Sequence, residues 1–296
     1  MGIEVGFVGL GNMGLPMAEA LIDAGMSLAV YNRTGAKAEP LVAKGARRAT
    51  SAAEAATPGA IAITMVADDA ALESVTLGEA GLAARLGKGG IHLSMSTVSP
   101  ALAQRLAEYH ARYGGTYLAA PVFGRPDRAR ARKLWIVISG AAAAKERVRP
   151  LLEAMGQQTF DMGEQPAAAN VMKLVNNFLI MNAIEALSEA LVMAEKGGLD
   201  PTMVARVLTG SLFNCPLYQG YLDTIIKRAF EPAGFKLKLG LKDIELALEM
   251  AGDASVPVPS ASLIRDRILT GLARGRGEMD WAVVALGARE DAGLKP

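Results

Sequence analysis

The sequence predicts an α/β domain built on a doubly wound, mostly parallel sheet, followed by an all-α domain. Three observations support this prediction: a glycine-rich turn after the first apolar run, short apolar runs that alternate with helical segments, and an almost wholly helical pattern in the last part of the chain. Strands that alternate with helices form parallel sheets. We therefore expect a first domain over residues 1–163 and a second over residues 164–296.

Short apolar runs in the first domain are expected to form its strands. They are Ile3–Val8, Leu28–Tyr31, Ala60–Val66, Gly90–Ser94, Thr116–Ala119, Leu134–Ser139 and Gln158–Asp161.

A long helix is expected to join the two domains. Residues 167–196 contain almost no helix breaker, and at 1.5 Å per residue they would extend about 45 Å, too long for one small domain. Gly197 and Gly198 end this helix. Asp200 is expected to cap the next helix, with Pro201 in its first turn, and residues 257–260 separate the last helices.

The first turn has the spacing Gly-x-Gly-x-x-Gly between the strand Ile3–Val8 and a predicted helix, Leu15–Ala24. The first glycine permits a tight turn, the second leaves room for a pyrophosphate, and the third lets the helix pack on the strand. Backbone N–H groups at a helix start bind phosphate. The sequence therefore predicts a dinucleotide site made by Gly9, Leu10, Gly11, Asn12, Met13 and Gly14.

The end of the second predicted strand indicates which dinucleotide binds. NAD enzymes usually place a carboxylate there, on the ribose 2′-hydroxyl, but this chain has Asn32, Arg33 and Thr34. A guanidinium pairs with a 2′-phosphate, which a carboxylate would repel. We therefore expect NADP(H) as the cofactor. Lys37 either adds a second charge or lies on the surface.

The composition limits the remaining possibilities. A net charge of +1 gives no electrostatic argument for nucleic acid or a charged membrane surface. Cys215 is the one cysteine, so no internal disulfide forms, and with only two histidines we expect no metal. We identify no signal segment and no apolar stretch of about 18 residues. A soluble, cytoplasmic protein is expected.

The long helix also holds the candidate catalytic residues. Lys173 and Asn177 are one turn apart, and Asn170 precedes the lysine by three residues, so the three share one face. A partly buried ammonium can protonate a carbonyl oxygen as hydride arrives at the carbon. We predict that Lys173 is the general acid and base. Asn177 is expected to hold a substrate hydroxyl or to orient the lysine.

These residues resemble the β-hydroxyacid dehydrogenases, which include 3-hydroxyisobutyrate dehydrogenase and relatives of 6-phosphogluconate dehydrogenase. The motifs that match, in the family's order, are residues 9–14, 32–34, 96–100, 173–177 and 241–244. The resemblance implies a Rossmann-type N-terminal domain, a helical C-terminal domain, an active site in the cleft, and a homodimer or homotetramer built through the helical part. It implies that Lys173 and Asn177 are catalytic.

Four further residues are candidates for cofactor contacts. Val66 and Ala67 end a strand where the sheet edge should pass the adenine ribose. The hydroxyl of Thr97 is expected either to bind the nicotinamide ribose or the substrate, or only to mark the end of a strand. The resemblance implies that Lys242 closes over the cofactor, while Asp243 caps or pairs within its own helix. The two histidines, His92 and His110, are scattered in the sequence, and we assign them no catalytic role.

One departure from the family pattern concerns the substrate. The family's Asp-Ala-Pro-Val-Ser-Gly-Gly loop, whose serine and glycines bind the substrate carboxylate, occupies residues 119–125 here, with Phe123 in place of the serine. The lost hydrogen bond is worth about 1 kcal/mol. Gly124 still offers a backbone N–H. Arg125 is expected either to bind a carboxylate or phosphate of the substrate, or to lie in a solvent-exposed loop with the basic residues that follow it. Phe123 favours a bulkier or more apolar substrate, or one without an acid group.

The sequence therefore predicts an NADPH-dependent oxidoreductase that acts on a small aldehyde or β-hydroxy acid, similar to 3-hydroxyisobutyrate dehydrogenases and to semialdehyde or glyoxylate reductases. An imine reductase-like enzyme is the alternative: Lys173 argues against it, and Phe123 keeps it open. A non-catalytic NADP-binding scaffold or a nucleic-acid reader fits less well. The expected partners are a small-molecule substrate and further copies of the chain, without nucleic acid or membrane.

Overall fold

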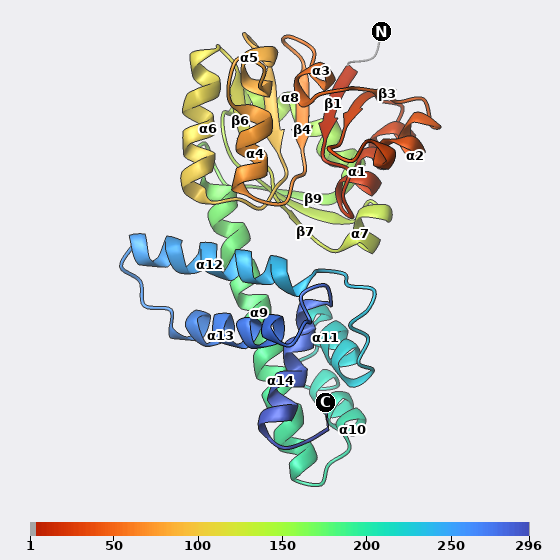
Figure 1. Cartoon of the computed structure of the whole chain (residues 1–296), viewed down its shortest axis with the longest axis vertical. Coiled ribbons are helices and arrows are strands. Elements are labelled where there is room, and N and C mark those ends of the chain that lie inside the picture. Colours follow the sequence, from red (N-terminus) through yellow and green to blue (C-terminus); the bar gives the residue numbers. More distant parts are fainter. Residues whose placement is uncertain (1–3, 296) are drawn as a thin grey trace. The chain divides into compact units, whose positions relative to one another are not determined.

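The structure is a computed structural model that describes residues 4–295 (Figure 1). The chain divides into two compact units, one that ends at Lys173 and one that begins at Leu174. The division falls inside the long helix because its first turns, which include Ala169 and Met172, pack with the first unit. The Ile3 end of the first expected strand lies outside the described residues.

Two sheets form the framework of the first unit. Its strands are Glu4–Val8 (β1), Ser27–Tyr31 (β2), Arg47–Arg48 (β3), Ile61–Thr64 (β4), Ile91–Ser94 (β5), Thr116–Ala119 (β6), Val122–Phe123 (β7), Leu134–Ile138 (β8) and Gly156–Asp161 (β9). A parallel six-stranded sheet has the order β3-β2-β1-β4-β5-β6. The chain runs outward from β1 to β3 and then returns to the other side of β1, so the switch point lies between β1 and β4.

Helices cover both faces of this sheet, as a doubly wound parallel sheet requires. They are Gly14–Asp23 (α1), Gly35–Ala38 (η1), Glu39–Val42 (α2), Ala52–Ala55 (α3), Asp69–Thr76 (α4), Leu82–Leu86 (α5), Pro100–Arg112 (α6), Pro126–Arg130 (α7) and Ala142–Met155 (α8). Alternate strand residues face opposite sides. Phe7 packs with Met17 of α1 and Val148 of α8, whereas Val8 packs with Ala55 of α3 and Leu82 of α5. The predicted fold class is confirmed.

The last strands of the first unit pair differently from the prediction. Residues 134–139 and 158–161 were expected in the main sheet, but β8 and β9 pair with each other and form a second sheet of order β7-β8-β9. The chain reverses direction after β7, through residues 124–133, so β7 runs antiparallel to β8. Strands β3 and β7 were missed because each is two residues long, too short for any apolar alternation to show.

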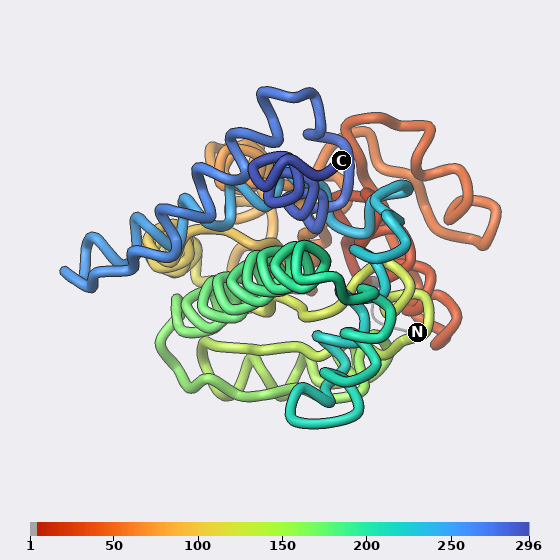
Figure 2. The backbone as a smooth tube through the Cα atoms, turned by 90° about the horizontal axis from the view of Figure 1, so that it is seen from below, coloured from red at the N-terminus to blue at the C-terminus, as the bar shows by residue number. Residues whose placement is uncertain are grey.

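The second unit is helical in its described residues. Its elements are the remainder of Ala168–Lys196 (α9), then Pro201–Thr209 (α10), Pro216–Ile226 (α11), Leu237–Asp253 (α12), Pro259–Ala273 (α13), Trp281–Val283 (η2) and Val284–Asp291 (α14). Figure 2 shows α9 as one unbroken coil, which confirms the long helix predicted over residues 167–196. Asp200 accepts hydrogen bonds from the N–H groups of Thr202 and Met203, which confirms the predicted cap.

Helix α9 corrects the expectation that the chain has no long apolar stretch. An 18-residue window of this helix has a mean hydropathy of 1.3, enough by length and composition to cross a membrane. Half of that window is buried inside the protein. One such helix is weak evidence for a membrane span, because the core helix of a soluble protein passes the same test.

His92 and His110 lie together, although the sequence suggested that they are scattered. Both side chains are buried in the first unit, and Nδ1 of His92 is 2.9 Å from Nε2 of His110. Nε2 of His92 is 2.9 Å from Oγ1 of Thr64. Burial lowers the pKa of His110 to about 4 and, together with the neighbouring His110, lowers the pKa of His92 well below its ordinary value. Both rings are therefore neutral near pH 7.

Candidate dinucleotide and catalytic site

The turn after β1 has glycines for two different reasons. Gly9 has a φ of +98°, and a Cβ there would lie 2.3 Å from the carbonyl oxygen of Met65. A Cβ on Gly14 would lie 1.9 Å from the carbonyl oxygen of Gly9. The protein's own packing thus requires these two glycines. A Cβ on Gly11 would meet nothing within 4 Å, so a closely approaching phosphate, rather than internal packing, explains this glycine.

Helix α1 begins beside Gly11 without charge compensation from its own residues. Its N-cap, Met13, makes no side-chain capping hydrogen bond, and its first turn holds no acidic residue. The partial positive charge of the helix start therefore favours an anion. The open space at Gly11 and this helix start fit the pyrophosphate of a nicotinamide dinucleotide.

Asn32 joins the end of β2 to the glycine turn. Its Oδ1 accepts a hydrogen bond from the N–H of Leu10 at 2.9 Å, and its Nδ2 donates to the carbonyl of Thr34 at 2.9 Å. Both ends of the amide thus bind backbone. Asn32 shapes the two segments on which the cofactor residues were predicted.

Arg33, Thr34 and Lys37 follow β2 and are exposed. Within residues 4–295, Arg33 makes no ion pair with a carboxylate. A guanidinium that is exposed and not neutralised suits a phosphate ligand.

Arg48 is a neighbouring cation that was not predicted from the sequence. Its Nη2 would lie 2.3 Å from a Cβ on Gly35, and its Nη1 lies 2.7 Å from Oε1 of Glu39. The guanidinium therefore lies against the segment that follows Thr34. No sequence signal located it, because its position depends on the pairing of the two-residue strand β3 with β2.

The segments after β4 and β5 meet at the same edge of the sheet as the glycine turn, because all three follow parallel strands. Oγ of Ser96 accepts a hydrogen bond from the N–H of Val66 at 2.9 Å and is fully buried. The half-buried side chain of Val66 packs against the apolar cluster that contains Leu72 and Val98. Next to this link, Ala67 is exposed and Thr97 is half-buried. This edge, at the switch point, is where such sheets bind ligands.

Lys173 lies in the first turns of α9, against the smaller sheet. Its Nζ is 5.4 Å from the ring centre of Phe123 on β7, within the range of a cation–π interaction. Asn170 is 1% exposed and its Nδ2 donates to the carbonyl of Val98 at 3.3 Å. This bond ties the start of α9 to the segment after β5. The first unit therefore holds Lys173 and the predicted dinucleotide residues together.

Asn177, one turn after Lys173, is bound within the second unit. It is 3% exposed, and its Nδ2 donates to Oδ2 of Asp243 at 2.5 Å. Nζ of Lys242 lies 2.8 Å from Oδ1 of Asp243, which is itself 3% exposed. Asp243 thus pairs within its own helix, α12, and also accepts from α9. Lys242 and Asn177 share one buried carboxylate.

Two basic side chains of the loop after β7 already contact other residues of the first unit. The guanidinium of Arg128 lies 4.8 Å from the ring centre of Trp135, and Arg132 forms a 3.0 Å ion pair with Asp23. Gly124 has a φ of +134°, and half-buried Arg125 is the N-cap of α7. Of the basic residues here, Arg125 is nearest in sequence to Phe123.

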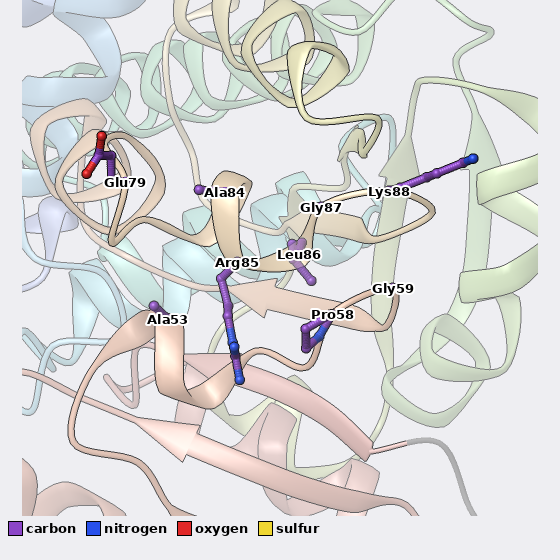
Figure 3. A pocket seen from close by; sticks show the side chains of 9 residues that line it. All are labelled: Ala53, Pro58, Gly59, Glu79, Ala84, Arg85, Leu86, Gly87 and Lys88. Carbon is purple, nitrogen blue, oxygen red and sulfur yellow. The ribbon is translucent and has the colours of Figure 1, made fainter.

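A hollow of about 650 Å³ lies at a different place on the first unit (Figure 3). Gly59 and Gly87 line it, just before β4 and β5, so it lies at the amino ends of the strands, opposite the glycine turn. Arg85 is held there, because its Nε donates to the carbonyl of Ala56 at 3.0 Å. Figure 3 shows Lys88 extending away from Arg85. The hollow is thus separate from the candidate site.

A doubly wound sheet with a phosphate-binding turn at its switch point, followed by a helical unit, defines a nicotinamide-dependent oxidoreductase. Residues 4–163 match the NAD binding domain of 6-phosphogluconate dehydrogenase. Residues 167–286 match the family model described as NAD-binding of NADP-dependent 3-hydroxyisobutyrate dehydrogenase. The chain belongs to the β-hydroxyacid dehydrogenase family, as its motifs predicted.

Similar proteins extend over almost the whole chain. An uncharacterized oxidoreductase of Bacillus subtilis, YfjR, is 44% identical over 95% of this chain and 98% of its own length. The 2-hydroxy-3-oxopropionate reductase of Escherichia coli is 35% identical over 94% of each chain. The solved structure of Mycobacterium tuberculosis 3-hydroxyisobutyrate dehydrogenase has a TM-score of 0.87 at 27% identity, over 98% of this chain and 100% of the other. The predicted fold and enzyme class are confirmed.

Proposed function

We propose that this protein is an NADPH-dependent enzyme that transfers hydride between nicotinamide and a small aldehyde or β-hydroxy acid. The observation that carries the proposal is the position of Lys173, whose helix is tied by Asn170 to the segment after β5. A lysine next to the predicted nicotinamide edge of the sheet is suited to proton transfer. The 2-hydroxy-3-oxopropionate reductase among the relatives supports a small carbonyl substrate.

Lys173 is the proposed proton donor. The bound cofactor supplies the hydride to the carbonyl carbon. Nζ of Lys173 gives one proton to the carbonyl oxygen as its π bond breaks, which yields the alcohol, and neutral Nζ takes that proton back in the reverse direction. We assign Asn177 to holding the substrate hydroxyl or orienting Lys173, with Asp243 fixing its amide.

NADPH is the proposed cofactor because of the residues after β2. Exposed Arg33 and Thr34 are assigned to the 2′-phosphate, with Arg48 as an additional cation beside them. The pyrophosphate is assigned to the backbone of residues 9–14. Val66, Ala67, Thr97 and Lys242 are proposed to complete the cofactor site, and Phe123, Gly124 and Arg125 to contact the substrate.

The test is oxidation of NADPH and of NADH by the purified protein with glyoxylate, succinic semialdehyde, 2-keto acids, simple aldehydes and cyclic imines. We expect turnover of an aldehyde with NADPH, and a loss of at least a hundredfold in kcat for Lys173→Ala with little change in NADPH affinity. Lys88→Ala, which removes an exposed lysine, is the matched control. Near-normal turnover by Lys173→Ala would refute the assigned role. Turnover confined to imines would favour the imine reductase alternative.

We also propose that the protein forms a homodimer or homotetramer in the cytoplasm through its helical unit. Several apolar side chains of that unit are exposed, including Met193 at 74%, Met203 at 63% and Leu212 at 93%. Such a set of exposed apolar residues is typical of an interface. Light scattering after size-exclusion chromatography would give the oligomeric state, and a monomer at micromolar concentration would contradict the proposal.

A further inference from the structure

We propose that Phe123 positions the ammonium of Lys173, and that the same ring selects carbonyl substrates whose substituent next to it is uncharged and apolar. This inference rests on the proposed function, because it takes Lys173 to be the proton donor. The inference adds Phe123 as a residue that sets the geometry of proton transfer. It also narrows the proposed substrates to carbonyl compounds with an uncharged, apolar substituent.

The backbone and the ring of Phe123 are both held in place. In β7, Phe123 lies opposite Trp135 of β8, and Val122 lies opposite Ile136, so antiparallel pairing fixes the strand. The half-buried ring packs against an apolar cluster that contains Val137 and Ala169. A ring fixed in this way is a rigid surface rather than a mobile side chain.

This ring provides a defined location for a flexible cation. Nζ of Lys173 lies 5.4 Å from the ring centre, where the negative face of the π system attracts an ammonium. A lysine side chain has many rotamers, and ordering it costs entropy. Phe123 therefore reduces the conformational freedom that Lys173 would lose on reaching the reactive geometry. A leucine at the same position would fill space without attracting the charge.

The same contact determines what a substrate meets. The carbonyl oxygen must lie within hydrogen-bonding distance of Nζ to receive its proton, which places the carbonyl carbon and its substituent near the ring. A phenyl ring has no donor for a carboxylate, and its negative face repels one. An apolar substituent instead leaves water on contact with the ring. The site should therefore prefer neutral aliphatic or aryl aldehydes to aldehyde acids of the same length.

The experiment compares butanal with succinic semialdehyde, which share a four-carbon chain and differ in a terminal methyl or carboxylate. We expect a kcat/KM at least tenfold higher for butanal with the unaltered protein and NADPH. Phe123→Ser, which supplies a hydroxyl donor, is expected to reverse this preference. Equal values for the two substrates, a preference for the acid, or an unchanged preference in Phe123→Ser would overturn the selectivity.

The positioning role is tested with two other variants. Phe123→Leu is expected to lower kcat for butanal about tenfold while KM changes less than threefold, and Phe123→Tyr, which keeps the ring, is expected to stay within threefold of normal kcat. Phe160→Leu makes the same change at an exposed residue of β9 and is expected to have no effect. Normal kcat in Phe123→Leu would overturn the positioning role. Lys173→Ala separates the hypotheses, because its full activity would refute the proposed function whatever the Phe123 variants do.

Discussion

The side-chain oxygen of Asn32 accepts a hydrogen bond from the backbone N–H of Leu10 at 2.9 Å, which links the end of β2 to the glycine turn. Asn32→Ala leaves that N–H without its partner, and we expect a loss of about 1 kcal/mol in the free energy of unfolding. Because the turn itself is loosened, the Kd values of NADPH and NADH should rise by similar factors. Urea denaturation and fluorescence titration would measure both effects.

The carboxylate variant Asn32→Asp provides a sharper version of this test. An aspartate oxygen can still accept from the N–H of Leu10, although the carboxylate cannot donate to the carbonyl of Thr34. Its charge would repel a 2′-phosphate beside Arg33. NADH binding should therefore recover relative to Asn32→Ala while NADPH binding stays weak. Equal recovery for both cofactors would show that the 2′-phosphate does not lie near this residue.

Arg33 is expected to set the preference between the two cofactors. Arg33→Ala removes an exposed guanidinium that makes no ion pair within residues 4–295, so the protein's stability should change little. Loss of a charge-assisted pair with phosphate, worth about 1.5–3 kcal/mol, should weaken NADPH roughly ten- to a hundredfold. NADH affinity should change less than threefold. Arg132→Ala, a surface arginine paired with Asp23, is the control, and equal losses for both cofactors in Arg33→Ala would refute the phosphate assignment.

Features that follow from local backbone rules could be predicted from the sequence. The positive φ of Gly9, the glycine at position 14, the cap at Asp200 and the end of α9 each depend on a few consecutive residues. The close approach of Gly9 to the carbonyl of Met65 depends instead on the packing of a distant segment. The expectation that Gly11 leaves room for a phosphate could also be drawn from the sequence, because the second glycine of such a turn lets the pyrophosphate approach the backbone.

Features that depend on pairing between distant segments could not be predicted. The approach of Phe123 to Lys173 requires the two-residue strand β7, and the position of Arg48 requires β3. The pair His92 and His110 forms because β5 and α6 pack together, although neither residue belongs to a motif. In each case the sequence specifies the residue, but strand register and helix packing determine its neighbours.

The buried histidine pair should make the first unit sensitive to acid. The pKa of His110 falls from 6.5 to about 4 on folding, so between these pH values the unfolded chain binds a proton that the folded chain does not. Stability is therefore fully present above pH 6.5 and decreases as the pH falls toward 4. The loss from His110 alone approaches about 3 kcal/mol, and His92, shifted in the same direction, adds to it.

Urea denaturation at several pH values between 7.5 and 4.5 would measure this dependence. His110→Gln keeps a polar group next to His92 but cannot be protonated, so its stability should decrease less steeply than that of the unaltered protein below pH 6.5. A parallel pH dependence in the two proteins would show that carboxylates, rather than this pair, cause the acid sensitivity.

Asp243 is expected to support both the stability of the second unit and catalysis. It accepts from Asn177 and pairs with Lys242 while only 3% exposed. Asp243→Ala would remove the carboxylate that accepts from the Asn177 amide and pairs with Lys242, at a cost of about 2 kcal/mol. Because Asn177 would lose a bond that orients its amide, kcat should fall about tenfold or more. Asp223→Ala breaks an exposed ion pair between Asp223 of α11 and Lys227, the residue that follows this helix. It is the matched control and should cost about 0.5 kcal/mol or less. If both variants had the same kcat, then Asp243 would serve packing alone and the orientation of Asn177 would not depend on it.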